Sequence, residues 1–327
     1  MPAMSESWRP AASREVMQLR ARMLRDIRAF FDQRGVLEVE TPLLSSSSTT
    51  DPNINSFSTS YQHQRLYLNT SPEYCMKRLL AAHGDAVYQV CKSFRDGELG
   101  PNHNPEFTML EWYRPGFDMF ELMDELGDLV QMLAGNYALK IDSVQKISYA
   151  EAYQHAAGIN PHATSADECR SCAVKHGIEQ PVGLEDDIDG WLDWLLTQLV
   201  MPKFQADGFT FIYDYPESQS ALAKLYKNQF GFNVAARFEL FYGDTELANG
   251  YHELLDAGEQ RGRFEHENMQ RVKAGLQPSI IDEKLLEALE HGLPACSGVA
   301  LGLDRLLMSL TGVDKIERIL AFPFSRI

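Results

Sequence analysis

Residues 94–113 read FRDGELGPNHNPEFTMLEWY, and this stretch decides the fold. Residues 106–113 are rich in aromatic and other strand-forming side chains, and residues 87–94 (VYQVCKSF) have the same character. Such runs favour β-strands. The residues between them, 96–105, are rich in glycine, proline and asparagine, which is typical of a turn. The sequence therefore predicts a β-hairpin with strands at 87–94 and 106–113.

The second strand of this hairpin carries a carboxylate among apolar neighbours. Successive side chains of a strand point to opposite faces, so Phe107, Met109, Glu111 and Tyr113 share one face. A carboxylate in such surroundings is costly to bury unless it meets a cation. The pattern leaves two interpretations open, a solvated strand face or a site for a cationic ligand.

The rest of the chain alternates between helical and strand-like patterns. Apolar residues recur at three- and four-residue steps in several stretches, which predicts helices. Residues 45–50 (SSSSTT) form a polar loop that we expect to be mobile. Strands joined by short turns favour a largely antiparallel sheet flanked by helices, an α+β fold. Helices are expected at 13–35, 70–84, 118–134, 256–274, 282–291 and from Asp304 onward, and further strands at 36–39, 209–215, 234–242, 246–253 and 318–322.

Composition narrows the class of protein. The 327 residues include 30 Lys plus Arg and 46 Asp plus Glu, a net charge of −16, and such a surface repels nucleic-acid phosphates. No apolar run approaches the roughly 20 residues that span a membrane. The first residues, MPAMSESWRP, do not resemble a signal peptide. Five scattered cysteines argue against a disulfide framework, so we expect a cytoplasmic enzyme.

Residues 143–208 differ in composition from their surroundings and carry no site signature. We expect a helical insertion within one catalytic domain that spans residues 1–327. Cys169, Cys172 and His176 have the spacing of half a metal site. A structural zinc needs four ligands, and no second pair of cysteines follows, so a polar surface helix is the favoured interpretation.

The sequence lacks the usual glycine-rich nucleotide motifs. It contains neither a P-loop, GxxxxGK[ST], nor a strand–GxGxxG–helix unit. A nucleotide site would therefore depend on arginines and a metal ion, with Arg95 and Arg305 as candidates. Glu239 and Glu246 lie on adjacent predicted strands and form a reasonable Mg²⁺ site if phosphates supply the remaining oxygens. Charged side chains on a wet strand face are the alternative.

Three stretches in sequence order resemble motifs of one family. Residues 34–42 resemble motif 1 of the class II aminoacyl-tRNA synthetases, residues 94–111 resemble motif 2 of their lysyl branch, and residues 298–305 resemble motif 3. Residues 246–254 are similar to the segment that precedes motif 3 in that branch. The resemblance implies a class II catalytic domain and, through motif 1, a homodimer.

Two departures from lysyl-tRNA synthetases refine the resemblance. Only residues 1–12 precede the first predicted helix, so we expect no anticodon-binding domain and no tRNA partner. Residues 71–74 (SPEY) and Ala300 resemble truncated paralogues of lysyl-tRNA synthetase instead. The resemblance implies that (R)-β-lysine is activated with ATP and joined to a lysine of elongation factor P. The methyl group of Ala300, where glycine is usual, would reshape the pocket away from α-lysine.

The resemblance also assigns roles to individual residues. Arg95 would bridge the substrate carboxylate and the α-phosphate, Arg305 would hold the γ-phosphate, and Phe107 would stack on adenine. Mg²⁺ would be held by Glu239 and Glu246. The expected nucleotide contacts are Arg95, Asp96, Gly97, Asn104, Phe107, Glu246, Leu247, Gly302 and Arg305. The expected amino-acid contacts are Ser71, Pro72 and Glu73 for one ammonium group and Glu111, Tyr113, Asn249 and Glu253 for the other end.

One mismatch keeps alternatives open. The family's Arg-Asn-Glu reads Arg95-Asp96-Gly97 here, so the glutamate expected at the adenine amino group is missing. Glu98 or the Gly97 backbone would replace it. A catalytically inactive, amino-acid-binding regulator is therefore an alternative. An amino-acid ligase with another acceptor, or a residual lysyl-tRNA synthetase, would differ only in the acceptor.

Overall fold

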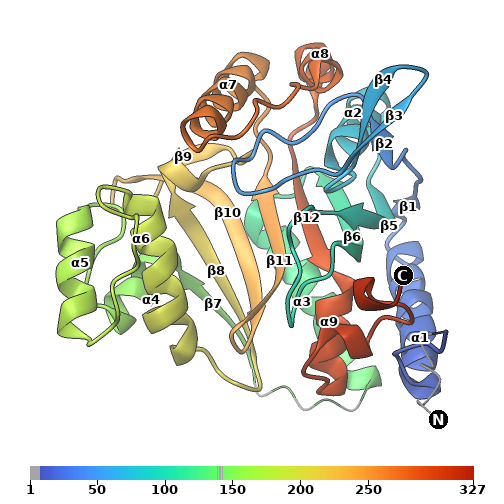
Figure 1. The fold of residues 1–327 in the computed structure, drawn as a ribbon, viewed down its shortest axis with the longest axis horizontal. Coiled ribbons are helices and arrows are strands. Elements are labelled where there is room, and N and C mark those ends of the chain that lie inside the picture. The colour runs from blue at the N-terminus through green and yellow to red at the C-terminus, as the bar shows by residue number, and fades with distance from the viewer. Residues whose placement is uncertain (1–7, 138, 140, 142) are drawn as a thin grey trace, which may run out of the picture. The chain divides into compact units, whose positions relative to one another are not determined.

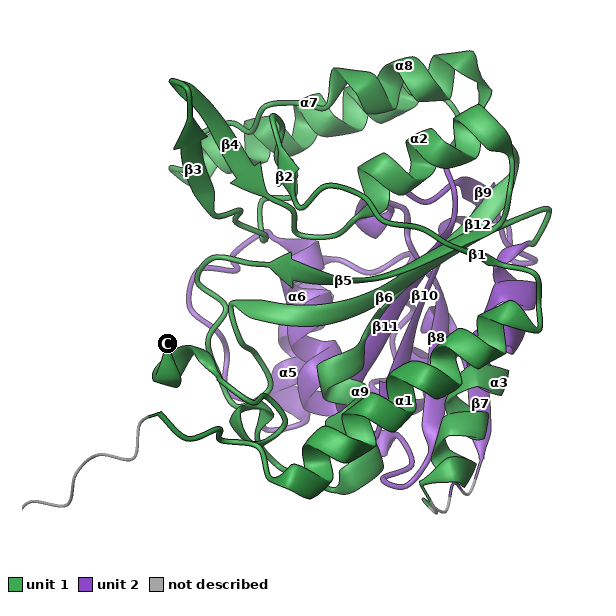
Figure 2. Cartoon of the chain, turned by 90° about the vertical axis from the view of Figure 1, so that its right-hand side faces the viewer, with its two compact units in different colours: residues 1–117, 128–139, 255–327 green, residues 118–127, 140–254 purple. Residues whose placement is uncertain are grey.

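The computed structural model describes residues 8–137, 139, 141 and 143–327. The chain divides into two compact units, shown in different colours in Figure 2. Unit 1 contains residues 1–117, 128–139 and 255–327, and unit 2 contains residues 118–127 and 140–254. Helix α3 (Met119–Asn136) is divided between them. The single catalytic domain stays a prediction.

Unit 1 contains the predicted hairpin. Its strands pair antiparallel from Val87↔Tyr113 to Phe94↔Glu106, which confirms the hairpin and both strand starts. A strand near the C-terminus, at 296–302, pairs antiparallel with the second hairpin strand, and the two-residue strand at 37–38 pairs parallel with the first. These are, in spatial order, β1 (Leu37–Glu38), β5 (Val87–Phe94), β6 (Glu106–Pro115) and β12 (Cys296–Gly302), and a separate sheet has the order β2 (Leu44–Ser45), β4 (Gln64–Leu68), β3 (Ser58–Tyr61).

Helices cover both faces of the β5–β6 hairpin. Helices α2, α7 and α8 gather on one side of it, and α1 and α9 lie on the other (Figure 2). The first helix forms where predicted, because the Ser13 side chain caps it by accepting a hydrogen bond from the Val16 N–H. The bounds of these five helices are α1 (Arg14–Asp32), α2 (Glu73–His83), α7 (Ala257–Lys273), α8 (Glu283–Gly292) and α9 (Leu303–Thr311), and short 3₁₀ turns lie at Ile316–Arg318 and Phe324–Arg326.

Unit 2 is a second sheet region with its own apolar cluster. Strand β10 pairs antiparallel with both β11 and β8, whereas β7 and β8 run parallel (Figure 1). Tyr149, Tyr153 and Trp191 are fully buried in the cluster between helices and sheet. The elements are β7 (Val144–Ser148), α4 (Tyr149–Ala156), α5 (Ala166–Lys175), α6 (Ile188–Leu195), a π turn (Leu196–Val200), a 3₁₀ turn (Met201–Lys203), β8 (Phe209–Pro216), a 3₁₀ turn (Glu217–Gln219), β9 (Leu225–Lys227), β10 (Asn233–Tyr242) and β11 (Thr245–His252).

The structure corrects two expectations in unit 2. The stretch 143–208 is not wholly helical, because β7 joins the sheet beside β8 before the helices begin. Cys169 and Cys172 lie on the inner face of α5, so the interpretation as a polar surface helix holds only for the outer face of that helix. Both are buried in the apolar cluster, where a thiol behaves as a small hydrophobic group.

One expectation in unit 1 is also wrong. Residues 318–322 form no strand; instead the N–H groups of Ala11 and Ala12 donate to the carbonyls of Ala321 and Leu320. The polar loop at 45–50 has two buried side chains, Ser47 and Thr50, and its mobility stays a prediction. The Ser47 hydroxyl donates to Asp282 at 2.6 Å, and the Thr50 hydroxyl donates to Glu267. In the part of the chain that the structure describes, no helix is long and apolar enough to cross a membrane.

A buried carboxylate fixes α9 on the hairpin. Asp304 is 2% exposed; it accepts a hydrogen bond from the Thr108 N–H at 2.6 Å and another from the Arg20 guanidinium. Three elements that are distant in sequence therefore meet at one side chain.

We predict that Asp304→Ala lowers the free energy of unfolding by about 2–4 kcal/mol, because it leaves a buried N–H and an arginine without their acceptor. Urea denaturation measures the change. Asp314→Ala is the control, because its ion pair with Arg318 is exposed and should contribute less than about 1 kcal/mol. Equal losses in the two variants would contradict the role of Asp304.

Candidate active site

In unit 1, Glu111 lies in the middle of β6 and is 2% exposed. Its cross-strand neighbours are Gln89 on β5 and Ala300 on β12, and the Tyr113 hydroxyl donates to its Oε1 at 2.7 Å. The solvated interpretation of this face is therefore wrong. The alternative, in which the buried carboxylate binds a cationic ligand, stays a prediction.

The electrostatics of the same face follow from burial. Cys91 lies on β5 two residues after Gln89, on the same face and opposite Met109. Burial raises the pKa of the Cys91 thiol to about 12, and the charge of Glu111 adds to the rise, while interactions with Ser93 and Gln89 oppose it. The thiol is thus protonated near neutral pH, and Cys91 adds no charge beside Glu111.

Arg95 follows β5 directly, at the start of the turn. Its N–H donates to the Pro105 carbonyl at 2.9 Å, so the backbone pairing of the hairpin fixes its position. The guanidinium lies 5.2 Å from the centroid of the Phe107 ring and 3.7 Å from Glu98. The three side chains predicted to meet phosphate and adenine therefore form one cluster.

Hydrogen bonds with main-chain groups fix Asp96 and Asn104 in the same turn. The Asp96 N–H donates to the Asn55 carbonyl at 2.8 Å, and Gly97 has a φ of +83°, which glycine adopts without strain. Asn104 is buried, with its Nδ2 donating to the Glu106 carbonyl and its Oδ1 accepting from the Phe324 N–H. Its amide thus holds main chain on both sides.

Arg305 lies in the first turn of α9, and Gly302 is the residue that caps that helix. The Arg305 Nε donates to the Asn102 carbonyl at 3.3 Å, and the guanidinium also contacts His103. Gly302 lies opposite Met109 on the neighbouring strand. Motif 2 and motif 3 residues are therefore adjacent within unit 1.

Ser71 and Pro72 directly precede α2, and Glu73 is its first residue. Pro72 is the capping residue, and the Ser71 hydroxyl accepts from the Glu73 N–H at 3.4 Å. The Glu73 carboxylate forms an ion pair with Lys77 at 2.7 Å. Lys77 is 2% exposed, so a buried cation already orients this carboxylate. Sequence reasoning missed Lys77, although its spacing of four residues from Glu73 was a signal.

In unit 2, Glu239 is buried and held by two side chains. The Arg237 guanidinium contacts its Oε1, and the Tyr215 hydroxyl donates to its Oε2 at 2.7 Å. Burial raises the pKa of Glu239 to about 6; Arg237 opposes this shift, and the carboxylate of Glu246 reinforces it. The wet strand face considered for this pair is therefore wrong for Glu239.

The predicted residues of β11 share this environment. Asn249 lies opposite Glu239, and Glu246 lies opposite Phe241 across a bulge that contains Leu247. Glu246 and Asn249 therefore share the face of Glu239, whereas Leu247 is buried. The Arg237 Nε donates to the Asn249 Oδ1 at 3.2 Å.

Glu253 follows β11 and is 1% exposed, and its backbone pairs with Ala223. Arg237 is a second residue that sequence reasoning missed, because its partners lie on three separate segments. Besides Glu239 and Asn249, its guanidinium donates to the Gln219 carbonyl at 2.9 Å.

The donor set on this face fits Mg²⁺ rather than a structural metal. No group of three or more metal-binding side chains occurs among the residues that the structure describes. A carboxylate oxygen has two lone pairs, so each Glu239 oxygen can still accept one further contact. Mg²⁺ prefers a few carboxylates with phosphate and water oxygens, which Glu239 and Glu246 would satisfy.

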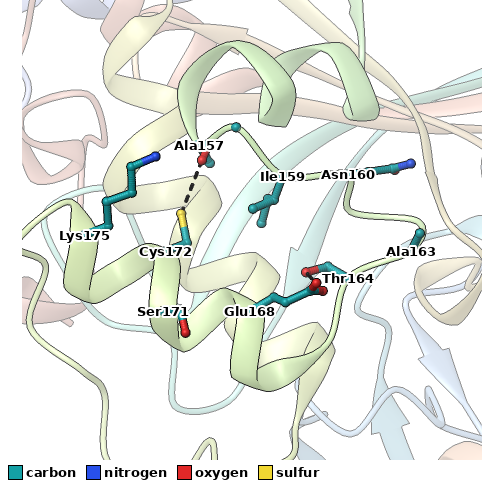
Figure 3. A pocket seen from close by; sticks show the side chains of 10 residues that line it. Ala157, Ile159, Asn160, Ala163, Thr164, Glu168, Ser171, Cys172 and Lys175 are labelled. Carbon is teal, nitrogen blue, oxygen red and sulfur yellow. Dashed lines mark hydrogen bonds between the residues drawn. The ribbon is translucent and has the colours of Figure 1, made fainter.

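Unit 2 also contains a pocket of about 410 Å³ around the loop between α4 and α5 (Figure 3). The Cys172 thiol in its wall donates to the Ala157 carbonyl at 3.5 Å, and Glu168 caps α5 together with Ser165. None of the residues predicted for the site lines this pocket.

Comparison with known proteins decides the family. Residues 6–326 match the family described as tRNA synthetases class II (D, K and N). The chain belongs to this class II tRNA synthetase family. The predicted family and the α+β fold with its large sheet are thereby confirmed.

Within the class II family the chain is similar to proteins named elongation factor P–(R)-β-lysine ligase. The relative from Vibrio vulnificus (strain YJ016) is 45% identical, over 98% of this chain and 99% of its own. The relatives from Vibrio atlanticus (strain LGP32) and Salmonella paratyphi B (strain ATCC BAA-1250 / SPB7) are each 45% identical, over 99% of this chain and 100% of their own.

The raised pKa of Glu239 predicts how this class II site affects stability. A carboxyl whose pKa is about 6 in the folded chain and 4.5 in the unfolded chain stabilises the fold when protonated. This contribution is complete below pH 4.5 and is lost as the pH rises through 6. We predict that the unfolding free energy of the wild type, minus that of Glu239→Gln, falls between pH 4.5 and 7. Denaturant titrations at several pH values measure it, and a difference that rises with pH would contradict the assignment.

Proposed function

We propose that this chain activates (R)-β-lysine with ATP and transfers it to the ε-amino group of a lysine on elongation factor P. The similarity to relatives of that name, over nearly the whole length of each chain, carries the proposal. The buried Glu111 supports it independently, because a diamino acid is a cation that such a carboxylate would bind.

The first step needs positioning more than proton transfer. The substrate carboxylate is already ionised; its oxygen bonds to the α-phosphorus of ATP while the bond to the bridging oxygen breaks and pyrophosphate leaves. Arg95 bridges the carboxylate and the α-phosphate, since its planar guanidinium can bind both. Arg305 binds the γ-phosphate. These arginines neutralise charge that builds up during the displacement.

The nucleotide is held by side chains around the hairpin turn. Adenine stacks on Phe107, over which Arg95 already lies. Of the two replacements for the missing glutamate, we favour Glu98, because its carboxylate belongs to the cluster of Arg95 and Phe107. Asp96, the Gly97 backbone, Asn104, Leu247 and Gly302 line the remaining nucleotide.

Mg²⁺ would be held by Glu239 and Glu246 and would supply positive charge to the phosphate oxygens. Arg237 and Tyr215 orient Glu239 for this role through their contacts with its two oxygens. Because Arg237 also contacts Asn249, one guanidinium orients both a metal ligand and an amino-acid contact.

The amino acid is bound as a dication by carboxylates. Glu73, with Ser71 and Pro72, binds one ammonium group, and the other end contacts the set Glu111, Tyr113, Asn249 and Glu253. Ala300 lies directly opposite Glu111, so its methyl group is next to the carboxylate that binds the substrate. This position supports a preference for β-lysine over α-lysine.

In the second step a lysine of elongation factor P arrives as a free amine. Its nitrogen bonds to the carbonyl carbon of the adenylate, the bond to the phosphate oxygen breaks, and AMP leaves as the nitrogen loses a proton. We further propose that the enzyme is a cytoplasmic homodimer joined through residues 34–42 and that tRNA is not its substrate.

ATP–pyrophosphate exchange tests the first step. We predict strong exchange with (R)-β-lysine and much weaker exchange with (S)-β-lysine and α-lysine. Exchange strongest with α-lysine would favour a lysyl-tRNA synthetase activity. No exchange with any of the three would favour the inactive regulator and would contradict the proposal.

Arg95→Ala serves as the internal test of the assigned chemistry. The variant should lose exchange by at least about 100-fold, because a preorganised charge at the reacting phosphate is removed. Arg318→Ala, which removes an exposed arginine, is the control and should exchange normally. Normal exchange by Arg95→Ala would contradict the role given to Arg95.

A further inference from the structure

Gln89 has a buried polar atom that the fold does not satisfy. Its side chain is 3% exposed, and its Oε1 has no hydrogen-bond partner among the residues that the structure describes. A buried carbonyl oxygen without a partner is destabilising, because nothing replaces the hydrogen bond that it made with water. Such atoms are rare in folded proteins, and a bound ligand or water is a common reason for one.

The strand register puts this amide next to the predicted substrate carboxylate. Gln89 on β5 lies directly opposite Glu111 on β6, and Glu111 lies opposite Ala300 on β12. Directly opposed residues of antiparallel strands share one face of the sheet. The three side chains therefore form one row across unit 1.

The row of Gln89, Glu111 and Ala300 is accessible at its Ala300 end and buried at its Gln89 end. Ala300 is partly exposed, whereas Gln89 and Glu111 are buried; Cys91, beside the row on the same face, is also partly exposed. Tyr113 donates to the Glu111 Oε1, which fixes the carboxylate from the side away from Cys91. A group that enters past Ala300 and reaches Glu111 would also come within reach of the Gln89 amide.

The chemistry of the row selects the ligand group. Glu111 supplies a negative charge, and the neutral amide of Gln89 supplies a second, uncharged acceptor. The neighbouring Cys91 thiol is protonated and adds no further charge. An ammonium group has three N–H donors and needs several acceptors when it leaves water. A second carboxylate opposite Glu111 would repel the Glu111 carboxylate, whereas an amide oxygen adds an acceptor without adding charge.

We propose that the Gln89 Oε1 accepts a hydrogen bond from the substrate ammonium group bound by Glu111, which makes Gln89 a specificity-determining residue. This inference rests on the proposed function, because it takes a diamino acid as the substrate. Gln89 belongs to none of the three motifs by which the family resemblance was established, and only the strand register relates it to Glu111.

The test compares Gln89→Met with the wild type in ATP–pyrophosphate exchange. Methionine keeps the length of the side chain but has no amide acceptor. The KM for (R)-β-lysine should rise roughly tenfold or more, since a hydrogen bond to a charged group is lost, while the KM for ATP stays unchanged. Gln64→Met is the matched control and should change neither constant, because Gln64 is exposed at the start of β4.

Substrate analogues separate a direct contact from a structural effect. 3-Aminohexanoate lacks the ε-ammonium group, and 6-aminohexanoate lacks the β-ammonium group. For the analogue without the group that Gln89 contacts, wild type and Gln89→Met should give the same KM. For the other analogue the rise should persist. A rise of equal size with both analogues would mean a structural effect and would overturn the inference.

The outcomes also distinguish this inference from the proposed function. Exchange by the wild type, with an unchanged KM in Gln89→Met, would overturn the role of Gln89 and leave the function standing. Absence of exchange in the wild type would overturn both. If Gln89→Met does not fold, Gln89→Asn replaces it; this variant keeps the amide but withdraws it by one methylene, and the same dependence on the analogues is expected.

Discussion

The burial of the Glu111 carboxylate in the middle of β6 is the constraint on which the site depends. A charge that is 2% exposed is tolerated only if polar or cationic groups compensate for its lost hydration. The Tyr113 hydroxyl is one such group, and a substrate ammonium group would be the strongest. The stable antiparallel pairing on both sides of β6 holds the carboxylate in place while no substrate is bound. The fold thus maintains a charge that favours binding of a cation.

The turn that carries Arg95 is fixed from a distance by a buried arginine. Arg271 of α7 is 8% exposed and donates to the carbonyls of Asp51 and Ile54 and to the side chain of Asn55. The Asn55 carbonyl in turn accepts from the Asp96 N–H, one residue after Arg95. Helix α7 therefore orders the hairpin turn through the segment 51–55. Preorganisation of this kind lets a charged side chain act without first being ordered by the substrate.

Local patterns predicted the elements whose partners lie close in sequence. The hairpin, the capped first helix and the strands of β10 and β11 were all predicted from alternation, turn residues and capping. The strand β7 was missed because its partner β8 follows only after the helices α4, α5 and α6. The stretch 318–322 looked like a strand, but its backbone bonds go to residues 11 and 12 at the opposite end of the chain.

The residues assigned to the site were found by motif, whereas those that orient them were not. Arg237 contacts Asn249 and Arg271 contacts Asn55, which no local pattern connects, so these roles became visible only with the fold. The spacing of four residues between Glu73 and Lys77 was a local signal, but only the burial of Lys77 shows its importance. Glu111 shows the same limit. Its alternation with apolar residues raised the question of a cationic ligand, but only its burial excluded a solvated face. The polar loop at 45–50 is a further case, because Ser47 and Thr50 donate hydrogen bonds to carboxylates next to α8 and on α7.

Transfer to the acceptor protein tests the central claim most directly. Elongation factor P would be incubated with the enzyme, ATP and (R)-β-lysine, and its intact mass and tryptic peptides measured. The account predicts a mass increase of one β-lysyl group on a single lysine side chain, dependent on ATP and absent with Arg95→Ala. An unmodified elongation factor P, under conditions where the same enzyme sample forms the adenylate, would contradict it.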